Sequence, residues 1–414
     1  MATRESSSSG PAWANRRVII AGAAAVVLAA AGTATALAHH PSSAKHAVVK
    51  AQLASSSCTG PTGAAYVAVA GFQAFDAVNT ANCDLVQQYN VGDRPVPGTG
   101  TSDTNFDSTD EGVAISGNTL YFADTGNDTV AVIDSAELNV KNFDNPAETL
   151  IQVGFDPEDL AVTPDGGQVW VAETGPQTGN PSLGGISVIS TATDKVTARR
   201  RLPTDPREIA FSPSGATAYV TTGDGLYIIN TANLHVITVI HGLGNPQGVA
   251  VSPDGTKVYV TNTVQGQVDV ISAARNRVTS AIRVGQLPWQ LVISANGSTI
   301  YVADGDSNEI SVISTASDRV TDTIPDPGDP VSVALTPDGS ELWVGGLTSG
   351  IVTVFDTATD NSVGSFNVGF GGEPNAGDGE EPTGIVLTTT PTPGSSSAAA
   401  ANAKPNSAAA SGSR

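Results

Sequence analysis

The chain has 414 residues and a formal net charge of −21, which leaves room for two average domains or for one large all-β domain. The charge is concentrated between residues 61 and 390, where 39 Asp and Glu residues outnumber 12 Lys and Arg residues. Such a surface repels nucleic-acid phosphates and acidic lipid headgroups, so it argues against a nucleic-acid partner. The same charge favours solubility and attracts cations or basic partners.

Residues 1–38 have the pattern of an export signal peptide. Arg16 and Arg17 precede an uncharged, Ala-rich run over residues 18–38, and residues 36–38 (Ala-Leu-Ala) match an A-x-A cleavage site. The arginine pair also resembles a twin-arginine signal, so the Sec and twin-arginine routes both stay open. The run is long enough to remain as a membrane anchor, but its weak hydrophobicity favours cleavage. Either outcome places the folded domain in the cell envelope or outside the cell.

Two cysteines, Cys58 and Cys83, stand at the start of the domain that we predict over residues 58–390, after a linker at 39–57. A small even number of cysteines in an exported chain predicts one disulfide. A pair of free thiols is the alternative.

One unit recurs along the predicted domain, and its clearest copy covers residues 245–284. It contains four short runs of β-branched and aromatic residues separated by turn residues, which is the pattern of four short strands. Residues 253–255 (Pro-Asp-Gly) suit a tight turn between the first two strands, because Pro presets φ and Gly accepts a positive φ.

The aromatic anchor of the second strand allows the copies to be counted. The anchors follow one another at intervals of 55, 49, 49, 40, 42 and 42 residues, at Tyr66, Tyr121, Trp170, Tyr219, Tyr259, Tyr301 and Trp343. A period near 40 with four strands in each unit is typical of a β-propeller. The sequence therefore predicts an all-β, seven-bladed β-propeller.

The segment Val258–Asn262 (Val-Tyr-Val-Thr-Asn) resembles the signature of the YVTN β-propeller repeats. Such repeats occur in YncE-like periplasmic proteins and in surface-layer proteins, which are part of the wider WD40-like group of propellers. The resemblance extends over about residues 64–390. It implies the propeller fold and an exported location, and it says little about a ligand.

The first unit lacks its first strand, and the last unit is followed by a surplus one. The chain enters the first blade at residues 64–69, and residues 381–387 match a first strand with no blade after it. Pairing the two would close the ring and remove exposed sheet edges. We therefore expect truncation before Ile385 to destabilise the whole ring. Residues 391–414 are rich in Ser, Ala and Pro and are predicted to be a disordered tail.

The beginnings of the first strands point toward the mouth of the predicted central channel, on the face that we call the top. Connections from the fourth to the first strand and from the second to the third strand share this face. Aligning the repeats at their proline puts different side chains at one equivalent position, free of the packing needs of the blade. These candidate binding residues are Glu158, Arg207, Gln247 and Trp289, with Glu111 beside them. A solvated rim with varied residues is the alternative.

No cofactor is expected, although acidic top loops make Ca²⁺ a secondary hypothesis. The segment 304–309 begins like an EF-hand loop but lacks Gly at its sixth and Glu at its twelfth position, so ordinary turn chemistry is preferred. A richer group of carboxylates lies in two long loops that flank the first blade: Asp103, Asp107, Asp110, Glu111, Glu373, Asp378, Glu380 and Glu381.

The functional prediction is a monomeric, non-catalytic binding or scaffold module with a protein or small-molecule ligand. The chain has five histidines, three of them before the propeller, and it has no Cys-x-x-Cys-His haem motif and no Gly-x-Ser-x-Gly elbow. The alternative is a metal-assisted lactonase or lyase that uses carboxylates at the channel mouth: Glu111, Glu158, Asp159 and Glu208. A purely structural envelope protein is a third option. Membrane contact is expected only through an uncleaved N-terminal anchor.

Overall fold

The computed structural model describes residues 64–70, 74–80, 84–90, 112–135, 149–175, 184–368 and 381–388. These residues form 28 strands, which pair into seven four-stranded antiparallel sheets. Two short 3-10 turns, η2 (Thr125–Asn127) and η4 (Gly305–Ser307), follow the second strands of the second and sixth sheets. None of the helical segments in the described ranges is long and apolar enough to span a membrane.

Each sheet is one blade, in which the four strands follow one another from the axis outward. Blade 1 contains β28 (Glu381–Thr388), β1 (Ala64–Ala70), β2 (Ala74–Asn79) and β3 (Asp84–Asn90). Blade 2 contains β4 (Val113–Ser116), β5 (Thr119–Asp124), β6 (Thr129–Asp134) and β7 (Thr149–Gln152). Blade 3 contains β8 (Pro157–Val162), β9 (Gln168–Glu173), β10 (Gly185–Ser190) and β11 (Lys195–Arg201).

The remaining four blades have the same order of strands. Blade 4 contains β12 (Pro206–Phe211), β13 (Thr217–Thr222), β14 (Gly225–Asn230) and β15 (His235–His241). Blade 5 contains β16 (Pro246–Val251), β17 (Lys257–Asn262), β18 (Gln267–Ser272) and β19 (Arg277–Arg283). Blade 6 contains β20 (Pro288–Ile293), β21 (Thr299–Asp304), β22 (Glu309–Ser314) and β23 (Arg319–Pro325). Blade 7 contains β24 (Pro330–Leu335), β25 (Glu341–Gly346), β26 (Ile351–Asp356) and β27 (Asn361–Asn367).

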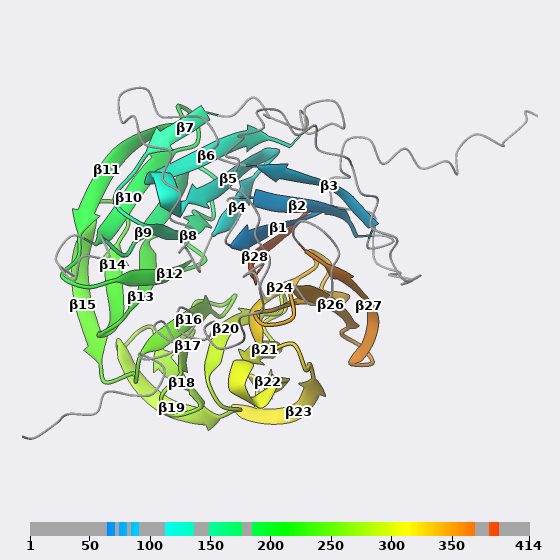
Figure 1. The fold of residues 1–414 in the computed structure, drawn as a ribbon. Helices are drawn as coiled ribbons and strands as arrows, with labels where there is room; N and C mark the ends of the chain where they lie inside the picture. Colours follow the sequence, from blue (N-terminus) through cyan, green and yellow to red (C-terminus); the bar gives the residue numbers. More distant parts are fainter. Residues whose placement is uncertain are drawn as a thin grey trace, which may run out of the picture. The chain divides into compact units, whose positions relative to one another are not determined.

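The seven innermost strands stand around one axis (Figure 1). Every neighbouring pair among them is in contact: β28 with β4, β4 with β8, β8 with β12, β12 with β16, β16 with β20, β20 with β24, and β24 with β28. This closed series of contacts confirms the predicted seven-bladed propeller.

The first blade is completed by the last strand, as the sequence predicted. β28 pairs antiparallel with β1, with Val386 opposite Tyr66 and Ile385 opposite Val67. Ile385 and Leu387 pack against the core shared with blade 7, whereas Val386 packs against the core shared with blade 2. The closing strand therefore contributes to both interfaces of blade 1.

The hydrophobic core is divided among the seven interfaces between blades. Each core cluster contains residues of two consecutive blades. Side chains alternate between the two faces of a strand, so on β17 Tyr259 faces blade 6 while Val258 and Val260 face blade 4. Because both faces are buried, the second strands are nearly continuous apolar runs, and this explains the repeated aromatic-aliphatic anchor.

The predicted turn in blade 5 has the expected geometry. Gly255 has a φ of +68°, and its N–H donates to the Ser252 carbonyl over 2.7 Å. The Asp254 carboxylate accepts the Thr256 N–H over 2.9 Å and the Ser252 hydroxyl. The turn is thus held by its own side chains and needs no bound ion.

The last residue of most second strands places a polar group inside the interface between blades. In blade 6 this residue is Asp304, which is fully buried and accepts the Gly285 N–H over 3.1 Å and the Ser311 hydroxyl over 2.6 Å. In blade 5 the same position is the amide of Asn262, which donates to Asp269 over 2.9 Å. The EF-hand-like segment therefore begins with a carboxylate that binds protein groups.

Blade 7 obtains the same buried carboxylate from a different residue. Its second strand ends in Gly346, where an added Cβ would lie 2.7 Å from the Gly328 carbonyl oxygen. The carboxylate comes instead from Asp326, which is buried, accepts the Gly328 N–H over 3.0 Å and hydrogen-bonds Thr353. Thr353 corresponds to Ser311 of blade 6, so the polar pair is kept while its source in the chain changes.

Several predictions from the sequence fall outside the described residues. Cys58 and Cys83, the residues before Ala64 and the tail after Thr388 are among them. The disulfide, the signal peptide, the linker and the disordered tail stay predictions.

We expect a chain that ends at Gly384 to lose stability in all blades together. The truncation removes Ile385, Val386 and Leu387 from two interfaces, at a cost on the order of 5 kcal/mol. Circular dichroism melting should show one transition at a clearly lower Tm, and a chain that ends at Thr390 is the control. An unchanged Tm would contradict the closure of the ring by β28.

We expect Asp304→Asn to weaken the dependence of stability on pH. Burial raises the pKa of Asp304 from 3.8 to about 7, so the folded state holds a proton that the unfolded state releases at lower pH. The contribution of Asp304 to stability is therefore full below its unfolded pKa and is lost as the pH rises through about 7.

Asn, the natural residue in blade 5, should make the protein about 1–2 kcal/mol more stable than wild type at about pH 8 and similar to it at about pH 4. Urea unfolding at both pH values measures this, and the exposed Asp322→Asn is the control. Equal pH dependence in wild type and Asp304→Asn would refute the prediction.

Candidate functional site

The residues that follow the blade prolines lie on a repeated irregularity of the innermost strands. In blade 4 the pairing of β12 with β13 holds at Pro206 and resumes at Ile209, and in blade 6 that of β20 with β21 holds at Pro288 and resumes at Leu291. Blade 5 has the same interruption, and in blade 3 the pairing breaks at Pro157 and resumes at Asp159. The residue after the proline therefore has no pairing partner on the second strand, at the top end of the innermost strand. The residues at this position are Glu158, Arg207, Gln247 and Trp289.

Threonine hydroxyls hold this irregular backbone in place between neighbouring blades. Thr221 accepts the Glu208 N–H over 3.1 Å and donates to the Gln247 carbonyl of the next blade over 2.6 Å. Thr261 repeats the bridge one blade further, because it accepts the Gly248 N–H and donates to the Trp289 carbonyl, both over 2.7 Å. The candidate positions in blades 5 and 6 are thus fixed by the same backbone contacts, although their side chains differ.

In blade 7 a serine replaces this threonine bridge. The position of Thr261 is occupied by Gly345, where an added Cβ would lie 2.3 Å from the Ser332 hydroxyl. Ser332, on β24, donates to the Pro382 carbonyl of blade 1 over 2.8 Å. The hydrogen bond to the next blade thus comes from the first strand of blade 7, whereas in blades 4 and 5 it comes from the second strand. The closing strand is held by this contact in addition to its pairing with β1.

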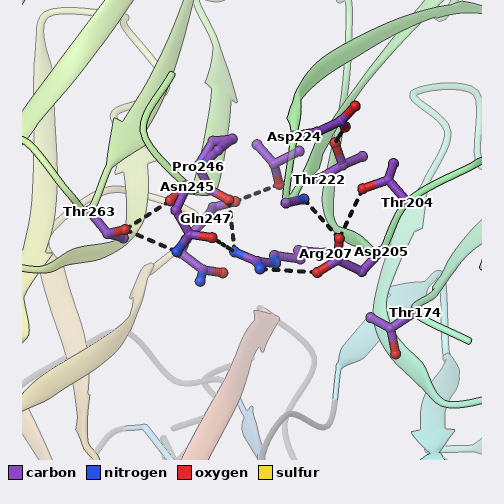
Figure 2. A network of polar contacts seen from close by, with 12 residues as sticks. Thr174, Thr204, Asp205, Arg207, Thr222, Asp224, Asn245, Pro246, Gln247 and Thr263 are labelled. Carbon is purple, nitrogen blue, oxygen red and sulfur yellow. Dashed lines mark hydrogen bonds and ion pairs between the residues drawn. The ribbon is translucent and has the colours of Figure 1, made fainter. Parts of the chain in front are cut away.

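Arg207 is a clamp between blades 4 and 5 (Figure 2). Its guanidinium forms an ion pair with Asp205 at 3.1 Å and donates to the Asn245 side chain over 2.9 Å and to the Pro246 carbonyl over 3.3 Å. Its side chain is 14% exposed. Most of the hydrogen-bonding capacity of Arg207 is therefore used within the protein, a role that the sequence analysis did not predict.

Asp205 joins this clamp to the neighbouring turn of blade 4. Its carboxylate also accepts the Gly223 N–H over 3.1 Å and the Thr204 hydroxyl over 2.9 Å. Burial works to raise the pKa of Asp205, but the Arg207 guanidinium and the hydrogen bond from the Thr204 hydroxyl lower it below its usual value. Asp205 is thus held as an anion at neutral pH, which keeps the ion pair intact.

The sequence does contain a signal for this network, namely an Asp or Asn immediately before the blade proline. Such a residue occurs at Asp156, Asp205, Asn245 and Asp329. Asp and Asn tolerate the left-handed backbone conformation, and Asn245 adopts a φ of +61° there. Asn245 binds Arg207 of the preceding blade, whereas Asp205 binds Arg207 and Gly223 of its own blade. The signal therefore identifies the residue but not its contact.

Asp159 and Glu208 follow the candidate positions on two consecutive innermost strands. Asp159 accepts the Ile209 N–H of the next blade over 3.0 Å, and Glu208 accepts the Val249 N–H of the blade after that. Each keeps a partly exposed surface, but the surrounding strands remove most of its hydration. Burial raises the pKa of Asp159 to about 6, and burial together with the Asp159 carboxylate raises the pKa of Glu208 well above its usual value.

Trp289 differs from the other described tryptophans in its exposure. Trp170 and Trp343 are fully buried at anchor positions, whereas Trp289 is only partly buried. The edge of its indole lies against Gly305, where an added Cβ would be 3.0 Å from Nε1. The indole N–H is buried and has no hydrogen-bond partner among the described residues. Trp289 thus presents a partly exposed aromatic ring on a rigid strand.

The structure brings some of the predicted residues together and leaves others undescribed. Arg207 contacts the backbone before Gln247, and Gly248 packs against the Trp289 carbonyl, since an added Cβ would be 2.7 Å from its oxygen. Gly112 has the same relation to Glu158, with a Cβ-to-oxygen distance of 2.8 Å. This supports the alignment of the preceding residue, Glu111, with the other candidates, although Glu111 itself lies outside the described residues.

The acidic loops proposed for Ca²⁺ are also outside the described residues, apart from the backbone of Glu381. Within the described ranges, no group of three or more His, Cys, Asp or Glu side chains has the spacing of a metal site.

Solved structures similar to this chain share its fold at low sequence identity. A protein of unknown function from Desulfotomaculum acetoxidans has a TM-score of 0.61 at 16% identity and covers 80% of this chain and 100% of its own. Hydrazine synthase from Kuenenia stuttgartiensis has a TM-score of 0.57 at 20% identity, with 77% and 99% covered. The Cps50 β-propeller domain from Myceliophteria thermophila has a TM-score of 0.52 at 12% identity, with 62% and 85% covered. At these identities the likeness supports the fold alone.

None of the curated proteins matches the sequence. The sequence does match a family, the choice-of-anchor I domain, over residues 56–263, which is half of the chain and includes the strands from β1 to β17. The YVTN-repeat assignment stays a prediction. The chain belongs to the choice-of-anchor I domain family.

Proposed function

We propose that this chain is an exported, non-catalytic binding or scaffold module of the cell envelope. Its ligand or partner is bound on the top face, around the beginnings of the innermost strands, by Glu111, Glu158, Arg207, Gln247 and Trp289. Membership of the choice-of-anchor I domain family supports a surface-associated or exported propeller. The export pattern of residues 1–38 supports the same location.

The observation that carries this proposal is the placement of Trp289. The Thr261 bridge and the contact with Gly305 fix this partly exposed aromatic ring. The ring can therefore contact a ligand with little further loss of its own conformational entropy. Its buried N–H has no partner among the described residues, and a bound ligand that rearranges this side chain would supply one.

Exposed apolar residues on the same face give independent support. Phe155 lies in the connection that enters blade 3 and is 49% exposed, and Val264 lies in the turn after β17 and is 60% exposed. Both segments belong to the top face. Together with Trp289 they give an otherwise polar and acidic face the apolar elements that protein and ligand interfaces use.

The carboxylates Asp159 and Glu208 favour a structural role over the alternative of a lactonase. Each accepts a backbone N–H from the next blade. Gln290 occupies the equivalent position in blade 6 and accepts the Val333 N–H over 3.4 Å. A neutral amide at the same position of the repeat indicates that the contact requires an acceptor rather than a negative charge.

We expect Trp289 to report on the binding site through its fluorescence. Because Trp170 and Trp343 are buried, acrylamide should quench mainly Trp289 in a full chain that carries Trp13→Phe. Adding Trp289→Phe to that chain should abolish most of the quenching, and a purified cell-wall fraction that binds should protect the ring in the parent chain. Trp289→Ala should weaken co-sedimentation with that fraction by about tenfold, whereas Thr323→Ala, a change at an exposed position of β23, should not. Unchanged co-sedimentation of Trp289→Ala would contradict the proposed site.

We expect Glu208→Gln to be folded and more stable than wild type at neutral pH. Gln keeps the acceptor for the Val249 N–H and removes a carboxylate whose pKa is raised by burial and by Asp159. Glu208→Ala should instead cost about 1–2 kcal/mol, because it leaves the Val249 N–H without its acceptor. Urea unfolding separates the two variants. A lactonase activity that is present in wild type and lost in Glu208→Gln would favour the catalytic alternative.

A further inference from the structure

The outer rim of blades 3, 4 and 5 is basic, although the domain as a whole is strongly acidic. The outermost strands β11, β15 and β19 follow one another along this side of the ring (Figure 1). Their sequences contain no Asp or Glu. With Arg275 in the turn before β19, they hold seven of the 12 Lys and Arg residues between positions 61 and 390. The basic residues are all exposed: Lys195, Arg199, Arg200, Arg201, His235, His241, Arg275, Arg277 and Arg283.

The fold itself does not require this concentration of positive charge. Charged residues on an edge strand protect it from pairing with other chains, but the remaining outer strands do without a basic cluster. β27 carries no charged residue, and β23 combines Arg319 with Asp322. Asp194 in the turn before β11 and Asp224, 3.8 Å from His241, reduce the positive charge of the rim of blades 3 to 5 without cancelling it. Among the described outer strands, a net positive cluster occurs at this rim alone.

Blade 4 differs from both neighbouring blades at the centre of this rim. The outer strands contain a β-bulge, and in blades 3, 5 and 6 the extra residue is a threonine that donates to a carbonyl of the neighbouring strand. These hydrogen bonds, of Thr197, Thr279 and Thr321, measure 3.2, 3.0 and 3.2 Å. The extra residue is apolar in blades 4 and 7, at Ile237 and Val363. Val363 is partly buried and packs against the core between blades 7 and 1, whereas Ile237 is 47% exposed. Replacing the threonine by Ile loses a hydrogen bond and exposes apolar surface, so local packing does not explain it.

A second apolar side chain lies on the next blade of the same rim. Val278 on β19 is 39% exposed. Ile237 and Val278 are two of the four large apolar residues that are exposed within the described ranges, and both lie on strands whose charged residues are all basic. Apolar residues surrounded by polar and charged ones are the usual composition of a protein interface. Guanidinium groups bind carboxylates with two parallel hydrogen bonds.

We propose that the basic rim surface, formed by β11, β15 and β19, binds an acidic extended segment of a partner protein. Carboxylates of the segment meet Arg200, Arg201 and Arg277, and its apolar side chains cover Ile237 and Val278. A polypeptide fits better than a lipid surface, because β15 is the edge strand of its sheet and an extended backbone can add to such an edge by main-chain hydrogen bonds, which a lipid surface cannot do. The surface lies on the rim of the ring, so this proposal is independent of the top-face site.

The test uses a fluorescent synthetic peptide of alternating Glu and Val, with a Lys and Val peptide as the control for charge. Fluorescence anisotropy should show that the full chain binds the acidic peptide and that affinity falls as salt rises. The combined change Arg200→Glu, Arg201→Glu and Arg277→Glu should raise Kd at least about tenfold. Arg319→Glu, the same charge reversal on β23, should leave Kd within about twofold.

Ile237→Thr tests the binding surface with a change that is not expected to destabilise the fold. It introduces the residue that blades 3, 5 and 6 have at the bulge, so the Tm should stay the same or rise while Kd for the acidic peptide increases by about threefold. The matched change Thr321→Ile on blade 6 should leave binding unchanged. The proposal would be overturned by equal binding of the Lys and Val peptide, or by a Kd that neither rim variant alters. Binding of phosphatidylglycerol vesicles without binding of the acidic peptide would also overturn it, in favour of a membrane surface.

Discussion

Every blade of this propeller depends on an antiparallel pairing between the two ends of the folded chain. β28 supplies the innermost strand of blade 1, and its side chains enter the cores on both sides of that blade. Without β28, β1 would expose an unpaired edge and β24 would lose its neighbour around the axis. The contacts around the axis would then no longer form a closed series. Closure thus makes the seven interfaces cooperative, since none of them lies at an end.

The interfaces between blades have common polar requirements that different residues satisfy. A buried carboxylate or amide is supplied by Asp304 in blade 6, by Asn262 in blade 5 and by Asp326 in blade 7. The bridge across the top of the innermost strands is made by a Thr hydroxyl in blades 4 and 5 and by Ser332 in blade 7. Buried backbone groups must find partners, but they do not require the partner to come from one particular strand. This freedom allows the repeats to diverge while the ring is kept.

The same scaffold carries two surfaces of different character. On the top face, a partly exposed tryptophan, two exposed apolar residues and a clamped arginine stand among carboxylates. On the rim of blades 3 to 5, two exposed apolar residues lie on basic strands that carry no carboxylate. An acidic domain with one basic side is attracted to acidic partners only in a restricted orientation. The proposed site of the top face and the proposed surface of the rim thus differ in both position and charge.

Local sequence determined the number of blades, the four strands in each and the closing strand, because each of these depends on a pattern that repeats about every 40 residues. The turn at Gly255 and the partly exposed Trp289 were equally predictable, since they follow from the residue type at a position of the repeat. The tertiary structure alone decided that Arg207 binds Asn245, that Asp159 stands beside Glu208, and that Asp326 replaces the side chain missing at Gly346. It also gathered Arg200, Ile237 and Arg277 on one rim. These relations join residues on different blades, and the aligned repeats show which positions are equivalent but not which side chains meet across an interface.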